Sequence, residues 1–183
     1  MRKRIVFSLI GGVGGMLSLA FRSTATAYFG GQPTHIAYLA IDVLTFTILA
    51  LFILGSILLS SSRTKANSGF IAAAGSVLVG VLAGPVFPWG TIGYVLSFLI
   101  AAAVLPITLH RLSKRALKGM LFSFFGFLLG WAVSTLWIIA IWRFGPALLT
   151  SEPWTGWLPL GIVCYAFTLG LHLSVERNGT VIV

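Results

Sequence analysis

The amino-acid sequence predicts an all-α integral membrane protein, a bundle of six transmembrane helices with both termini on the cytoplasmic side. Three observations support this prediction. Of the 183 residues, 58% are hydrophobic and only 8% are charged, and the mean hydropathy is +1.03. The apolar residues are grouped in runs of about 20 positions, the length that a helix needs to cross a bilayer core. The basic residues lie mainly in the connections on one side.

Short polar or Gly/Pro-rich connections separate the six apolar runs, and these runs mark the expected spans. The spans cover residues 5–21, 36–60, 68–88, 90–109, 119–142 and 156–175. The runs do not alternate between polar and apolar residues as the strands of an outer-membrane barrel do. We therefore expect helices, and we expect residues 1–183 to form a single transmembrane domain.

The distribution of lysine and arginine gives the expected orientation. With a cytoplasmic N-terminus, ten of the 12 basic residues lie on the inner side, and only Arg22 and Arg143 lie outside. This is the bias of the positive-inside rule in a plasma (cytoplasmic) or cell inner membrane. It accounts for the net charge of +9 without a nucleic-acid partner.

The N-terminal segment has some features of a secretory signal. Basic residues, an apolar stretch and Ala25-Thr26-Ala27 follow one another in the order of such a signal. Arg22 interrupts the region before this cleavage-like site, and the apolar run is long for a signal. We therefore expect the segment to be retained as the first span.

A carboxylate stands at the start of the second apolar run. Asp42 is one of only three acidic residues in the chain. An ionised carboxylate in hydrocarbon costs several kcal/mol, so Asp42 must face the protein interior, water or a cation. Arg22 ends the preceding span on the same side, and we predict that the two side chains are in contact.

Other polar residues are expected near this contact. His35, Tyr38 and Asp42 share one helix face by their spacing, and the last outer connection carries further polar and aromatic side chains. The candidate ligand-binding residues are Arg22, His35, Tyr38, Asp42, Arg143, Glu152 and Trp154. Two interpretations remain open: the pair fixes the packing of two helices, or it belongs to an outward-facing site for a small solute. For Trp154, the default is an aromatic belt at the membrane interface.

A stripe of small residues follows one face of the first span. It consists of Ser8, Gly11, Gly15 and Ser18. Small residues allow helices to approach closely in lipid, so this face should pack against a neighbouring helix. The Gly11/Gly15/Ser18 face could also bind another membrane subunit.

The sequence contains no catalytic motif, neither HExxH nor GxSxG. The single cysteine, Cys164, lies in an apolar segment and is expected to be packed and inert. We predict no metal and no cofactor. Besides lipid, the expected ligand is a small solute, for a transporter or the substrate-binding membrane subunit of one. The size and six-span topology are similar to those of substrate-binding components of energy-coupling-factor vitamin transporters. The alternative is a non-catalytic structural or assembly subunit of a larger membrane complex.

Overall fold

The computed structural model is all-helical over the residues that it describes, apart from short turns. These residues are 2–29, 34–60, 95, 99–100, 102–103, 106–107, 114–146, 149 and 151–176. The long helices are α1 (Arg2–Tyr28), α2 (His35–Ser60), α5 (Lys114–Phe144) and α6 (Leu158–Glu176). A π-helical turn, η3 (Pro153–Trp157), directly precedes α6. Within the described residues, these four helices are long and apolar enough to cross a membrane.

The four helices correspond to the predicted spans 5–21, 36–60, 119–142 and 156–175. The predicted span 68–88 lies outside the described residues, as does most of the span 90–109. The helical character of the fold is therefore confirmed for the described part of the chain, in which four helices are long and apolar enough to cross a membrane. That the chain has six spans stays a prediction.

The first helix is longer than the sequence predicted. The apolar run ends at residue 21, but α1 continues to Tyr28. Hydropathy marks the end of the apolar face, whereas the backbone stays helical as long as no residue breaks it. The segment between Arg22 and Tyr28 contains neither glycine nor proline, and the first glycine after it is Gly30. Arg22 therefore lies well inside α1 instead of ending it.

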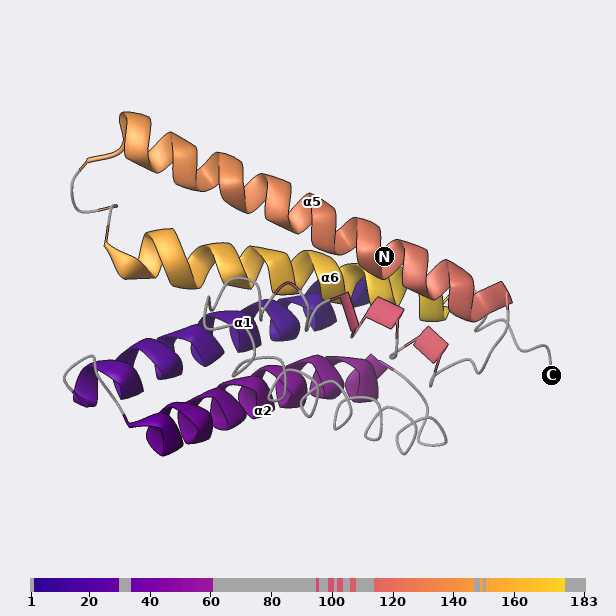
Figure 1. Cartoon of the computed structure of the whole chain (residues 1–183). Helices are drawn as coiled ribbons and strands as arrows, with labels where there is room; N and C mark the ends of the chain where they lie inside the picture. The colour runs from indigo at the N-terminus through magenta and orange to yellow at the C-terminus, as the bar shows by residue number, and fades with distance from the viewer. Residues whose placement is uncertain are drawn as a thin grey trace.

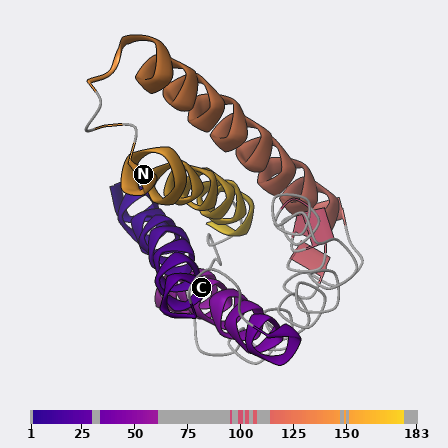
Figure 2. The same cartoon turned by 60° about the vertical axis from the view of Figure 1, so that its left-hand side comes forward.

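The helices form an arc in which α6 and α1 are the two central members. α6 packs extensively against α5 and α1, and α1 packs against α2. Figure 2 shows this order around the arc, with α5 and α2 at its two ends. In Figure 1, the last turns of α1 and α5 and the first turns of α2 and α6 lie together on the left. Neighbouring helices are thus antiparallel, and the chain passes from α1 to α2 and from α5 to α6 at this same end.

Glycines allow α1 and α6 to approach closely. A Cβ atom added at Gly15 would lie 2.5 Å from Cys164 Sγ and 3.0 Å from Leu160 O. In the other direction, a Cβ at Gly161 would lie 2.5 Å from Met16 Cγ. Such distances leave no room for a side chain, so the glycines permit the close backbone contact on which helix association in lipid depends.

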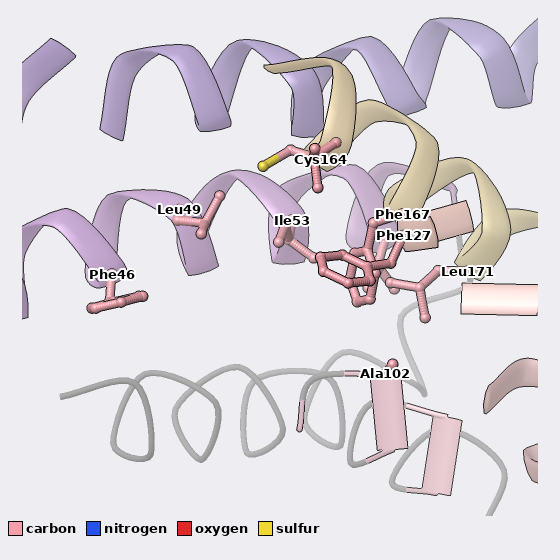
Figure 3. Close-up of a cluster of buried hydrophobic side chains, with 10 residues drawn as sticks. Phe46, Leu49, Ile53, Ala102, Phe127, Cys164, Phe167 and Leu171 are labelled. Atoms are coloured by element: carbon pink, nitrogen blue, oxygen red, sulfur yellow. The ribbon is translucent and has the colours of Figure 1, made fainter. Parts of the chain in front are cut away.

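A cluster of buried apolar side chains joins three helices and one further segment. Its buried members are Phe46, Leu49, Ile53, Ile57, Ala102, Phe127, Val163, Cys164, Phe167 and Leu171. Figure 3 shows Phe127 and Phe167 together beside Leu171 and Ile53, with Ala102 below them, on the side away from α1. The cluster fills the inner side of the arc, where α2, α5 and α6 face one another.

Buried hydroxyl groups bond mainly to the backbone of their own helix. Thr45 donates to Ile41 O at 2.7 Å, Ser56 to Ile53 O at 2.8 Å and Ser123 to Gly119 O at 2.7 Å. These local bonds satisfy the hydroxyls in an apolar interior. Ser134 differs, because its hydroxyl on α5 donates across the interface to Pro159 O on α6, at 2.8 Å.

Candidate functional site

The predicted contact between Arg22 and Asp42 is present. Arg22 Nε on α1 donates to Asp42 Oδ1 on α2 at 3.0 Å, forming a charge-assisted hydrogen bond and an ion pair. Asp42 lies seven residues after the start of α2, about 10 Å along the helix. The pair therefore joins α1 and α2 some two turns below the first residue of α2.

This ion pair lies at the boundary between an accessible end and a sealed interior. The side chains of Arg22 and Asp42 are 29% and 18% exposed. One turn deeper, Ser18 on α1 and Thr45 on α2 are fully buried. The pair is thus partly accessible to solvent, whereas the next polar side chains along both helices are not.

Glu152 lies against the next residue of α1. Ser23 Oγ donates a hydrogen bond to Glu152 Oε1, which ties α1 to the segment that leads into η3. Arg22 and Ser23 thus hold two different neighbours, α2 and the α5–α6 connection. Glu152 therefore lies at the same end of the bundle as Arg22 and Asp42, and its part in binding a solute stays a prediction.

At this end, Trp154 accepts a hydrogen bond through its backbone carbonyl. Trp137 Nε1 on α5 donates to Trp154 O at 3.0 Å, while the Trp154 side chain is exposed. Sequence reasoning did not single out Trp137. The one available signal was Pro159, whose missing N–H leaves a helical carbonyl in need of another donor.

The other candidate residues are less closely joined to the pair. Tyr38 is half-buried on α2, one turn before Asp42. Arg143 is exposed in the last turn of α5, where a cation interacts favourably with the helix C-terminus; no ion pair links it to another described residue. His35 begins α2, and its side chain lies outside the described residues.

The expected binding face for another subunit needs correction. Gly11, Gly15 and Ser18 are buried, and Gly11 and Gly15 face Thr168 and Cys164 of α6. The face is occupied within the chain because α6 packs directly on it. It is therefore not available to a partner subunit.

Cys164 is fully buried in the helix interface. Its sulfur faces Gly15 on α1, which confirms the prediction of a packed thiol. In the described part of the chain, no three His, Cys, Asp or Glu side chains are grouped so that they could hold a metal ion.

The described fold is a bundle of apolar helices, each long enough to cross a membrane, with a polar end formed by α1, α2 and the segment that leads into η3. No protein-family model matches the chain, and no curated protein or solved structure matches it either. The function must therefore be argued from the polar end itself.

Proposed function

We propose that the chain is a membrane subunit for transport of a small polar solute, with its binding site at the end of the bundle where Arg22 and Asp42 meet. The observation that carries this proposal is the pair of contacts made by two consecutive residues of α1. Arg22 bonds Asp42 of α2, and Ser23 bonds Glu152 of the α5–α6 connection. Three elements thus meet through polar groups at one accessible end.

The charges at this end suit a solute with both a cationic and an anionic group. The guanidinium of Arg22 can bind a carboxylate or phosphate through two parallel hydrogen bonds. The carboxylates of Asp42 and Glu152 can accept hydrogen bonds from an ammonium group. A charged residue retained in a transmembrane segment is a functional-site hypothesis by default, because its burial is costly.

The orientation of the site follows from the predicted topology. In the six-span arrangement with both termini cytoplasmic, the end that carries Arg22 and Asp42 faces outward, since ten of the 12 basic residues then lie inside. The site would therefore receive its solute from outside the cell membrane.

The second candidate is a structural subunit in which the pair only fixes α1 against α2. The direct 3.0 Å contact between Arg22 and Asp42 favours it, because the two charges already satisfy one another. The Gly11/Gly15/Ser18 face does not support the structural-subunit candidate, because α6 covers this face and leaves it closed to a partner helix.

A charge exchange separates the two functions. The variants are Asp42→Asn, the double variant Arg22→Asp with Asp42→Arg, and the control Thr24→Ala, an exposed position on the same end of α1. Native mass spectrometry of gently purified protein reports a retained small molecule, and thermal unfolding reports stability. Asp42→Asn should lower the free energy of unfolding by about 1 kcal/mol, a shift of about 2–4 °C in Tm.

For a solute site, the wild type and Thr24→Ala retain the small molecule, and both Asp42→Asn and the charge exchange lose it, even where the exchange restores the Tm. For a structural pair, the exchange restores the Tm and no variant carries a small molecule. Stoichiometric partner proteins without a ligand on the wild type would also count against transport.

A further inference from the structure

The π-helical turn before α6 lacks one backbone hydrogen bond because a proline stands where the donor would be. Leu158 N–H bonds to Pro153 O, five residues earlier, where an α-helix would use Trp154 O, four residues earlier. The next bond in this π register would run from residue 159 to Trp154 O. Residue 159 is proline and has no N–H, so the backbone cannot supply that donor.

A side chain of α5 supplies the missing donor. Trp137 Nε1 donates to Trp154 O at 3.0 Å, the same oxygen that residue 159 would otherwise bond. One helical turn away on α5, Ser134 Oγ donates to Pro159 O at 2.8 Å. Trp137 and Ser134 are three positions apart and therefore lie on one face of α5. Together they donate to a carbonyl before and a carbonyl after the change from π-helix to α-helix.

Both Pro159 and Trp137 favour the π register over the α register. In an α-helix, the ring of Pro159 would clash with the carbonyl four residues before it, that of Thr155. In the α register Leu158 N–H would satisfy Trp154 O, whereas in the π register this oxygen depends on Trp137, so the Trp137 bond lowers the cost of the π register. Removing either residue should therefore shift η3 towards ordinary α-helix.

We propose that η3 is a two-register switch, held in the π form by Trp137 and Pro159, and that its register sets the contact between Glu152 and Ser23. Glu152 directly precedes η3. A register change of one residue rotates the preceding backbone by about 100° relative to α6. This rotation takes Glu152 away from Ser23 and opens the polar end beside Arg22.

The surroundings of η3 allow such a movement. None of its five residues is fully buried, and Pro153 and Trp154 are exposed, so the turn lies at the surface of the bundle. Single π turns within helices are rare and frequently lie at functional sites. The role of the switch as a gate for a solute rests on the proposed function. The register of η3 and its effect on the Ser23–Glu152 contact do not depend on that function.

Disulfide cross-linking tests the switch. The double variant Ser23→Cys with Glu152→Cys places thiols where the two side chains now meet, and the native Cys164 is fully buried and stays unreactive. The cross-linking rate under mild oxidation is measured alone and with Trp137→Phe, which keeps a ring but removes the N–H. Trp142→Phe, an exposed tryptophan on the same helix, is the matched control.

Trp137→Phe should slow cross-linking by about 5-fold, the effect of one lost hydrogen bond, and Trp142→Phe should leave the rate unchanged. Pro159→Ala, which removes the ring clash, should slow cross-linking in the same way and provides a second variant should Trp137→Phe fail to fold. Unchanged rates in the folded variants would overturn the switch.

The measurement needs no solute, so the two proposals fail separately. Slower cross-linking in a protein that binds no small molecule would support the switch and remove its role in transport. Unchanged cross-linking in a protein that retains a solute in an Asp42-dependent manner would leave the transport proposal and remove the switch.

Discussion

At the scale of single residues, the described interior is arranged around glycines that face specific atoms of the next helix. Gly14 of α1 faces Phe52 of α2, while Gly11 and Gly15 face Thr168 and Cys164 of α6. α1 thus packs closely on both sides, through one of these glycines against α2 and through two against α6. By contrast, Gly55 on α2 has no neighbouring atom within 4 Å of an added Cβ, so glycine there is not required by packing.

These two kinds of glycine should respond oppositely to alanine. Gly15→Ala places a methyl group 2.5 Å from Cys164 Sγ and 2.9 Å from its Cβ, and should destabilise the protein by about 1–3 kcal/mol through overpacking. Gly55→Ala meets open space and should stabilise by about 0.5–1 kcal/mol through helix propensity. Thermal unfolding in detergent compares them. Equal effects would mean that α1 and α6 are not in contact at Gly15.

At the scale of elements, hydropathy located the four described helices but not their ends. The α1 helix extends past the apolar run because Arg22, Ser23 and Thr24 are compatible with helix. α5 begins at Lys114, five residues before the predicted span, for the same reason. The π turn was not predicted, because a register change has no periodicity of its own and depends on a donor from another helix.

A proline substitution tests the true end of α1. If the helix ended with the apolar run at residue 21, residue 25 would lie in a connection and tolerate proline. In the structure, Ala25 is inside α1, where proline removes a hydrogen bond and its ring clashes with the carbonyl of Phe21, at a cost of about 3 kcal/mol. Ala25→Gly, the control, should cost about 1 kcal/mol. Unfolding curves of the two variants decide the question, and a proline variant as stable as the glycine variant would contradict the longer helix.

At the scale of the whole molecule, the sequence predicted the membrane class, the four described helices and the contact of Arg22 with Asp42. The contact was predictable because a rare carboxylate and a rare outer cation lie one short connection apart, and burial in lipid demands pairing. The neighbours of each helix were not predictable. Small-residue stripes mark a packing face but do not say which helix covers it, so the face assigned to another subunit is occupied by α6.

The arrangement of the whole bundle places two connections at one end, and chemical labelling tests this directly. Thr24 on α1 and Ser151 before η3 are exposed near the Arg22–Asp42 end, whereas Lys118 is exposed near the start of α5 at the other end. Single cysteines at these positions are treated with a membrane-impermeant maleimide in intact cells that express the chain, before and after permeabilisation. The fully buried Cys164 should give a low background.

Thr24→Cys and Ser151→Cys should react before permeabilisation, because the predicted orientation places their end of the bundle outside. Lys118→Cys should react only afterwards, since the basic connections face inward. Labelling of Lys118→Cys alone in intact cells would reverse the orientation but keep the antiparallel fold, and the solute would then enter from the cytoplasm. Opposite behaviour of Thr24→Cys and Ser151→Cys would contradict the shared end itself, and with it the joining of α1, α2 and η3 at one site.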